Sequence, residues 1–327
     1  MPTTNGLSPK TLQEAIAHFS DEHNCIAAVA AMRWPDGKAT CPACGHKDHY
    51  WLATQKRWKC KECWKQFSVK VGTIFEDSPL PLSKWLLAMW MITNCRNGVS
   101  SWEIHRATGV TQKSAWFMMH RIRLSMQDGS TMKLGGEGKE IEADETFIGG
   151  KARNMHRDVR ARKVSGQGTK NHQVIVMGMV ERGGKIRTKV IRDRNRITMN
   201  TVVKENVKVG SALFTDEHGG YHGLAREYQH EIIDHATRYV DGKVHTNGME
   251  NFWSLLKRGL GGTYISVEPF HLFRYLDEQM FRYNNRKHED KKPVSDGERF
   301  KRALAHVAGK RVTYKELTGK EYLPEPF

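Results

Sequence analysis

Four of the six cysteines have a spacing typical of a metal site. They follow the pattern C-x2-C-x15-C-x2-C and are Cys41, Cys44, Cys60 and Cys63. Two such pairs of thiolates can supply the four tetrahedral sulfur ligands that Zn²⁺ prefers. We expect residues 50–52 and 57–59 to form short strands of a zinc ribbon. Because four sulfurs close the coordination shell, the site is expected to hold a structural Zn²⁺ and to take no part in catalysis.

A second set of candidate residues is acidic and lies at the ends of predicted strands. Asp144 lies in the strand expected at 139–144, and Asp216 follows a short buried strand at 212–215. Acidic side chains from separate elements can hold two Mg²⁺ (or Mn²⁺) ions for cutting or joining phosphodiesters. Glu145 and Glu217 follow the two aspartates. Since successive side chains of a strand point to opposite faces, these glutamates rank below the two aspartates as candidate ligands.

The predicted helix at 247–258 carries a polar face that could complete this site. Its 3.6-residue period separates four polar residues from three apolar ones: Asn247, Glu250, Ser254 and Lys257 against Met249, Phe252 and Leu256. Glu250 could bind a metal, and Lys257, two turns later, could bind a phosphate. The alternative is an ordinary surface pair of opposite charges.

The elements ahead of the acidic residues are mainly helical. Helical spacing is present at 8–30, 83–93, 100–108 and 111–125. A short glycine-containing turn at 109–110 separates the last two, as in a helix-turn-helix. The second helix of this pair carries three candidate DNA contacts, Lys113, Arg121 and Arg123. A helical connector with a basic face is the alternative interpretation.

The order of the remaining elements predicts a ribonuclease-H-like mixed sheet. A strand at 139–144 and a hairpin at 173–192 precede a helix at 198–207, strands at 212–215 and 231–233, and helices at 247–258 and 269–283. The expected fold class is multidomain α/β. Four regions are expected: an N-terminal helix and zinc ribbon at 1–78, a helix-turn-helix-like segment at 79–135, a catalytic domain at 136–290 and a basic C-terminal extension at 291–327.

The charge of the chain favours a polyanionic partner. Lys and Arg number 52 against 36 Asp and Glu, a net charge of +16. Residues 151–170 contain seven basic residues and one acidic residue, so we expect a phosphate-binding loop there. The candidate DNA contacts in this loop are Arg157, Arg160, Arg162 and Lys163. Arg258, on the helix expected at 247–258, is a further candidate. The chain shows neither a membrane-spanning apolar run nor a secretory signal, which predicts a cytoplasmic, nucleoid-associated protein.

These motifs together resemble those of bacterial insertion-sequence transposases of the Asp-Asp-Glu class with an N-terminal zinc ribbon and an ISXO2-like transposase domain. The resemblance rests on the ribbon, on the sequence EADETFIGGK at 142–151, and on HTN at 245–247 leading to ENFWSLLKR at 250–258. It implies that Asp144 and Asp216 are metal ligands and that Lys257 contacts the terminal phosphate.

The resemblance leaves the third metal ligand open, because family members carry either Asn or Glu there. A carboxylate brings charge to a hard cation and an amide only a dipole, so Glu250 is favoured and Asn247 becomes a supporting residue.

The expected activity is metal-dependent DNA cleavage and strand transfer at the inverted repeats of an insertion sequence. The expected partners are terminal-repeat DNA and target DNA, bound by a homodimer or larger assembly. The sequence is also compatible with two other functions. A ribonuclease-H-like nuclease or resolvase would share the site without strand transfer, and a non-enzymatic zinc-ribbon DNA-binding regulator would leave the polar face with Glu250 and Lys257 unexplained.

Overall fold

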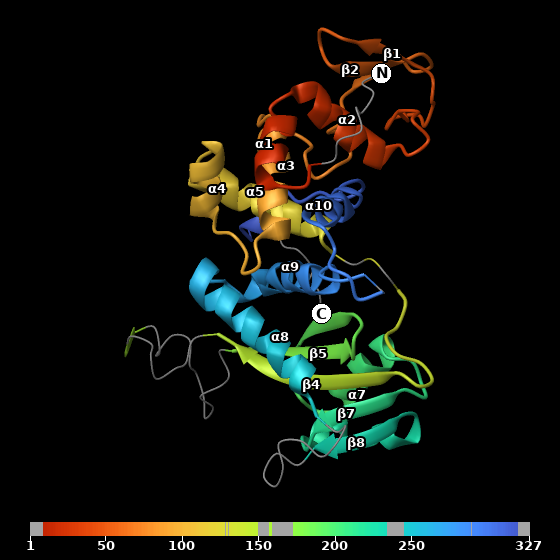
Figure 1. Ribbon diagram of the computed structural model, residues 1–327, viewed down its shortest axis with the longest axis vertical. Helices are drawn as coiled ribbons and strands as arrows, with labels where there is room; N and C mark the ends of the chain where they lie inside the picture. The colour runs from red at the N-terminus through yellow and green to blue at the C-terminus, as the bar shows by residue number, and fades with distance from the viewer. Residues whose placement is uncertain are drawn as a thin grey trace. The chain divides into compact units, whose positions relative to one another are not determined.

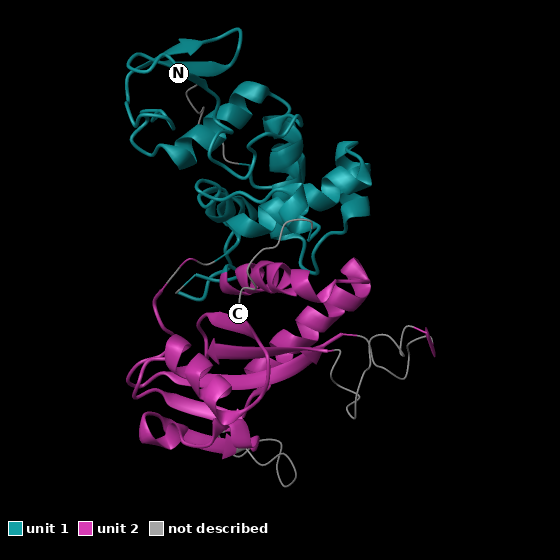
Figure 2. Ribbon diagram, turned by 180° about the vertical axis from the view of Figure 1, so that it is seen from behind, with its two compact units in different colours: residues 1–128, 285–325 teal, residues 129–284, 326–327 magenta. Residues whose placement is uncertain are grey.

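The chain folds into two compact units. The computed structural model describes residues 9–127, 129, 131–149, 157–158, 173–233, 245–288 and 290–319. The first unit comprises residues 1–128 and 285–325, and the second comprises residues 129–284 and 326–327 (Figure 2). The segment expected only as a basic C-terminal extension is therefore assigned mainly to the first unit.

The first unit begins with two short helices, α1 (Leu12–Phe19) and α2 (Glu22–Arg33). One continuous helical segment was expected from 8 to 30. The chain breaks between the two helices because Asp21 has extended backbone geometry and its side chain accepts a hydrogen bond from the backbone N–H of His23 (2.8 Å). Such a side-chain acceptor satisfies a backbone donor at the start of the second helix.

The ribbon follows as a three-stranded antiparallel sheet in the order β1-β2-β3. Its strands are β1 (His49–Leu52), β2 (Arg57–Cys60) and β3 (Gln66–Phe67). Trp58 is only 2% exposed, and its ring lies 5.1 Å from that of Trp34 and 5.9 Å from that of Phe67 between centroids. These aromatic contacts are the apolar core of the ribbon.

The remaining helices of the first unit come from both ends of the chain. They are α3 (Leu82–Asn94), α4 (Ser101–Thr108), α5 (Gln112–Ser125), α10 (Asp296–Leu304) and α11 (Tyr314–Leu317). The ring of Phe300 on α10 lies 5.4 Å from Trp90 on α3 and 5.4 Å from Phe19 on α1. Burial of these large rings ties the C-terminal helices to the N-terminal ones.

The second unit contains a five-stranded mixed sheet in the order β6-β5-β4-β7-β8. Its strands are β4 (Glu140–Ile148), β5 (Val174–Glu181), β6 (Ile186–Ile191), β7 (Ala212–Asp216) and β8 (Gln229–Ile233). β4, β5 and β6 pair antiparallel, whereas β7 is parallel to β4 and β8 is parallel to β7. This topology confirms the expected mixed α/β fold class.

Helices cover both faces of this sheet. α7 (Arg196–Asn206) packs on one face, and α8 (Asn247–Arg258) and α9 (Leu272–Asn284) pack on the other (Figure 1). Gly178 of β5 permits the close approach of α8. A Cβ atom at this position would lie 2.3 Å from Met249 Cε and 2.7 Å from Trp253 Cζ2.

Short turns complete the second unit. Two 3₁₀ turns, Gly219–Tyr221 and Leu224–Arg226, lie between β7 and β8, and a π-helical turn at Gly259–Tyr264 and a 3₁₀ turn at Pro269–His271 join α8 to α9. None of the described helices in either unit has the length and apolar character needed to cross a bilayer.

Candidate active site and zinc centre

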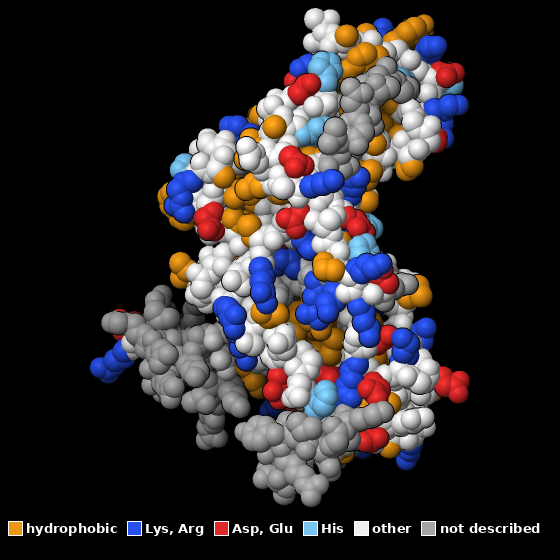
Figure 3. Space-filling model, in the orientation of Figure 1, with side chains coloured by type: hydrophobic (Ala, Val, Ile, Leu, Met, Phe, Trp, Pro, Cys, Tyr) orange, Lys and Arg blue, Asp and Glu red, His pale blue; other side chains and the backbone are white. Residues whose placement is uncertain are grey.

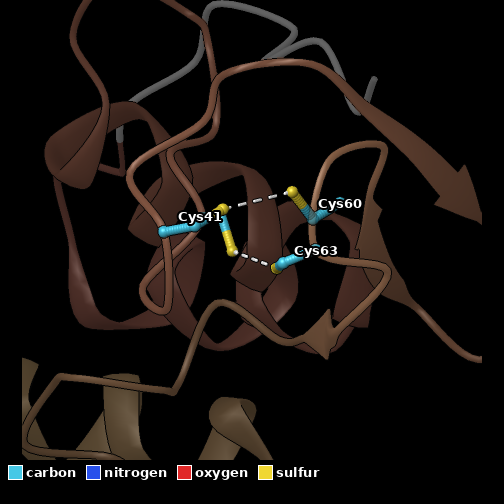
Figure 4. Close-up of side chains that lie close together, drawn as sticks. Cys41, Cys60 and Cys63 are labelled. Atoms are coloured by element: carbon cyan, nitrogen blue, oxygen red, sulfur yellow. Dashed lines mark hydrogen bonds between the residues drawn. The ribbon is translucent and has the colours of Figure 1, made fainter.

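The four cysteines of the spacing motif converge on one point in the ribbon. The Sγ atoms of Cys41 and Cys63 lie 3.7 Å apart, and those of Cys44 and Cys60 lie 3.5 Å apart (Figure 4). All four sulfurs lie within 4.8 Å of one another. Four thiolates bound tetrahedrally at a Zn–S distance of about 2.3 Å are separated by about 3.8 Å. The observed spacing therefore fits a four-cysteine zinc centre.

The ribbon shifts the pKa values of these thiols in opposite directions. A hydrogen bond from the backbone N–H of His46 lowers the pKa of Cys44, but desolvation and hydrogen bonds with the other three thiols outweigh it and raise the pKa to about 12. Desolvation raises the pKa of Cys41, but hydrogen bonds from the backbone N–H groups of Ala43 and Cys44 and from neighbouring thiols outweigh it and lower the pKa to about 7. Thiolates are the form that binds metal. The two other cysteines, Cys25 and Cys95, are not members of this cluster.

A second cluster forms where β4 and β7 lie side by side. One carboxylate oxygen from each of Asp144, Glu145 and Asp216 lies within 4.8 Å of the other two. Asp144 and Asp216 were expected to come together, and the strand pairing explains how. β7 runs parallel to β4 and ends at Asp216, so its carboxyl end brings Asp216 beside the middle of β4.

Glu145, which ranks below the two aspartates in the sequence analysis, has a carboxylate oxygen within 4.8 Å of theirs. Strand alternation does direct its side chain toward the α7 face, where it accepts hydrogen bonds from Arg194 Nη1 (2.8 Å) and Tyr221 Oη (3.0 Å). The pairing of β4 with β7 ends at Glu142. Beyond that point the edge of β4 is not covered by β7, so carboxylates from both faces approach Asp216.

The crowding of carboxylates alters the acidity of Asp144. Burial, followed by the charges of Glu145 and Asp216, raises its pKa to about 7, while a hydrogen bond from Trp253 acts in the opposite direction. A carboxylate with a raised pKa beside two others is an electrostatic environment that a divalent cation relieves. Carboxylate oxygens are also the ligands that Mg²⁺ prefers. This cluster therefore fits a divalent metal site.

α8 is fixed directly over this site. Trp253 Nε1 donates a hydrogen bond to Asp144 Oδ2 (2.9 Å), and Gly178, which pairs with Asp144 across the sheet, leaves room for the indole ring. The exposed and buried residues of α8 follow the predicted faces: Asn247, Glu250, Ser254, Lys257 and Arg258 are exposed, and Met249, Phe252, Trp253 and Leu256 are buried. Glu250 is not a member of the three-carboxylate cluster found among the described residues.

The start of α8 is held by the buried carboxylate of Glu142, which no sequence motif predicts as a functional residue. Glu142 is 1% exposed, and its carboxylate accepts hydrogen bonds from Arg182 Nε (2.8 Å) and from the backbone N–H of Met249 (3.1 Å). Arg182 Nη2 also donates to the carbonyl of His245 (2.7 Å). A carboxylate at a helix N-terminus is favourable because of the helix dipole. Strand alternation could have revealed Glu142, since it shares a face with Asp144.

We expect Glu142→Gln to lower the free energy of unfolding by about 2–4 kcal/mol, because it removes one charge of a buried ion pair. Glu140→Gln is the matched control. Glu140 binds the same Arg182 (3.0 Å) but is 34% exposed, so the change should cost less than about 1 kcal/mol. Urea denaturation of the three proteins measures this difference, and equal losses for both variants would contradict it.

The candidate DNA contacts fall into three groups. Lys113, Arg157, Lys257 and Arg258 are exposed. Arg121 and Arg123 are a correction, because they are only 3% and 1% exposed, and Arg121 Nη1 donates to the carbonyl of Glu76 (2.8 Å). Their burial within the first unit keeps these guanidinium groups from contacting DNA. Arg160, Arg162 and Lys163 lie outside the described residues.

Comparison with known proteins agrees with these two clusters. The family model of the ISXO2-like transposase domain matches residues 133–284, and that of the transposase zinc-ribbon domain matches residues 20–66. A transposase-like protein of Haemophilus influenzae is 31% identical over 102 residues, which cover 82% of that protein and 31% of this chain. The chain belongs to the ISXO2-like transposase family.

A second relative of this transposase covers more of the chain. It is a protein in the transposable element ISH50 of Halobacterium salinarum, 26% identical over 257 residues, which are 75% of this chain and 85% of the relative. The zinc-ribbon match includes all four clustered cysteines. The transposase-domain match includes Asp144, Glu145 and Asp216 and the whole of α8. The family therefore supports a DNA substrate, a zinc ribbon and a divalent metal site.

Proposed function

We propose that this transposase cuts DNA at the inverted-repeat ends of its insertion sequence and joins the freed ends to target DNA. The proposal rests on the meeting of Asp144, in the middle of β4, with Asp216, at the end of β7, beneath α8, whose exposed face carries Glu250 and Lys257. In the first reaction water breaks a phosphodiester bond and leaves a 3′-hydroxyl. In the second that hydroxyl replaces one oxygen of a target phosphodiester.

Each residue of the site would have a separate role in these two reactions. Asp144 and Asp216 would hold two Mg²⁺ or Mn²⁺ ions, which supply charge neutralisation and activate the attacking oxygen. The Trp253 indole would keep Asp144 oriented through its hydrogen bond. Lys257, at the C-terminal end of α8, would bind the terminal phosphate about 10 Å along the helix from Glu250.

Basic side chains lie on the same helices as this site and in the first unit. Lys and Arg gather over α8 and α9 on the face of the second unit shown in Figure 3, with acidic side chains near the start of α8. Arg258 and Arg157 would bind backbone phosphates, which position DNA without reading its sequence. In the first unit, the exposed Lys113 lies in the first turn of α5, the part of a recognition helix that contacts bases. Holding two DNA ends would require a homodimer or larger assembly.

We propose Glu250 as the third acidic ligand. The Glu145 side chain is 3% exposed, and Arg194 and Tyr221 already bind its two carboxylate oxygens. Glu250 is exposed one helical turn before Trp253, and among the described residues nothing binds its carboxylate. It is therefore available to a cation, and Asn247 at the start of the helix would support it.

Glu250→Gln is expected to lower strand joining by about 100-fold or more while the melting temperature stays unchanged, since the side chain supports only the site. Asn247→Ala should have a smaller effect, about tenfold. Glu145→Gln is the matched comparison and should lower the melting temperature, because it breaks the ion pair with Arg194. Joining by Glu250→Gln at the wild-type rate, with loss in a normally folded Glu145→Gln, would assign the third ligand to Glu145.

A further inference from the structure

The two zinc knuckles share a backbone geometry but differ in one residue. The residue after the second cysteine is Gly45 in the first knuckle and Trp64 in the second, and both have left-handed backbone, with φ of 75° and 59°. The same hydrogen bond closes each knuckle, from Cys41 N to the His46 carbonyl (2.9 Å) and from Cys60 N to the Lys65 carbonyl (3.0 Å). Left-handed backbone suits glycine and is strained for a bulky aromatic residue.

The Trp64 ring does not compensate for this strain by packing into the ribbon. It is 60% exposed, whereas the core of the ribbon is built from Trp58, Trp34 and Phe67. The Trp64 ring has a cation beside it instead, with Lys59 Nζ 5.0 Å from its centroid. Stability therefore does not explain a tryptophan at this position, because its backbone is strained and its ring is exposed.

A second aromatic residue on the same sheet has the same arrangement. Tyr50 is 50% exposed, and Lys61 Nζ lies 5.0 Å from its ring centroid. Tyr50 pairs with Lys59 across β1 and β2. Since side chains alternate along a strand, Tyr50 and Lys59 project from the face opposite Trp58. We call Tyr50, Lys59, Lys61 and Trp64 the aromatic–lysine face.

We propose that the aromatic–lysine face binds single-stranded DNA, with bases stacked on Trp64 and Tyr50 and phosphates beside Lys59 and Lys61. Exposed rings combined with basic side chains are the usual means of binding unpaired bases. Lysines alone would suffice for a duplex, whose base faces already stack on one another. The closed knuckle holds the Trp64 backbone in place before DNA arrives, which reduces the ordering cost of binding.

This inference rests on the proposed function, because a strand cut at an element end is the place where the terminal bases can separate and be bound unpaired by the transposase. The ribbon would bind single-stranded DNA more tightly than duplex DNA. The reaction at the catalytic site does not depend on this preference. The two proposals can fail separately. Joining of precut duplex ends by the wild-type protein tests the catalytic site, whereas the comparison below tests only the ribbon face.

The test uses the full chain with zinc bound and compares Trp64→Gly with wild type. Fluorescence anisotropy in Mg²⁺-free buffer would measure binding to fluorescein-labelled oligothymidine of about 12 nucleotides, a length within single-strand site sizes, and to a duplex of equal length. We expect Trp64→Gly to keep its zinc and its melting temperature, to bind the single strand about tenfold more weakly, and to bind the duplex as wild type does. Trp64→Phe, which keeps a ring, should retain most of the affinity.

Trp102→Ala is the matched control, because Trp102 is 56% exposed on α4 of the same unit without belonging to this face. It should leave single-strand binding unchanged. Wild-type single-strand affinity in Trp64→Gly would overturn the proposal. So would equal losses on single strand and duplex, which would make the face a general contact for DNA charge. Loss of zinc or a lower melting temperature in Trp64→Gly would also overturn it, since the ring would then be structural.

Discussion

Replacing Asp144 with asparagine is expected to abolish strand joining and, at the same time, to raise the melting temperature of the metal-free protein at pH 8. The pKa of Asp144 is raised from its ordinary 3.8 to about 7 by burial and by the neighbouring carboxylates. The folded state therefore disfavours the ionised carboxylate. The resulting destabilisation is absent below pH 4, grows as the pH rises, and is complete above pH 7, with an upper limit of about 4 kcal/mol.

The stabilising effect of Asp144→Asn should accordingly be larger at pH 8 than at pH 5. Millimolar Mg²⁺ should raise the melting temperature of wild type at pH 8 and leave that of Asp144→Asn unchanged, since a ligand that binds the folded state stabilises it. Thermal unfolding followed by circular dichroism measures both effects. Glu205→Gln is a suitable control, because Glu205 is 52% exposed and pairs only with a surface lysine among its described contacts. A lower melting temperature for Asp144→Asn at pH 8 would refute this account of the site.

Replacing Cys60 with serine is expected to release the zinc and unfold the ribbon. The aromatic core around Trp58 is small, and a metal-bound ribbon of this size takes much of its folding free energy from the metal, about 10–16 kcal/mol for structural Zn²⁺ in small domains. Zinc content measured by atomic absorption after dialysis should fall from one ion per chain to nearly none. Tryptophan fluorescence should shift toward longer wavelength as Trp58 and Trp34 become exposed.

The mixed sheet of the second unit should remain folded in Cys60→Ser, because its core contains none of the ribbon residues. Cys95→Ser is the matched control and should keep its zinc, since Cys95 lies outside the four-sulfur cluster. End binding should weaken in Cys60→Ser alone. A Cys60→Ser protein with full zinc content and an intact ribbon would show that the four-thiolate assignment is wrong.

Much of the site was predictable because its elements have strong local patterns. The bounds of α8 match the predicted helix at 247–258, and its buried residues follow the amphipathic spacing. The cysteine spacing predicted the zinc cluster, and the ends of two predicted strands located Asp144 and Asp216. In each case the signal lies within a short segment, so no tertiary information was needed.

Other features depend on contacts between segments distant in the sequence. Arg121 and Arg123 were predicted to face DNA because they are basic residues on a helix, but segments far along the chain cover this helix. Lys310, for example, donates to the carbonyl of Leu124 on α5 (2.8 Å). The contact of Phe300 with Trp90 and the approach of Glu145 to Asp216 arise in the same way. Local periodicity contains no information on such contacts.

Strand joining with the element's own ends tests whether Asp216 belongs to a metal-dependent transposase site. Duplex ends carrying an exposed 3′-hydroxyl would be incubated with a target plasmid, Mg²⁺ and either wild type, Asp216→Asn or the neighbouring control Glu217→Gln. We expect Mg²⁺-dependent joined products for wild type and Glu217→Gln, and none for Asp216→Asn. Cutting of the plasmid by wild type without joining of the ends would instead identify a nuclease, and tight binding without either reaction would identify a DNA-binding regulator.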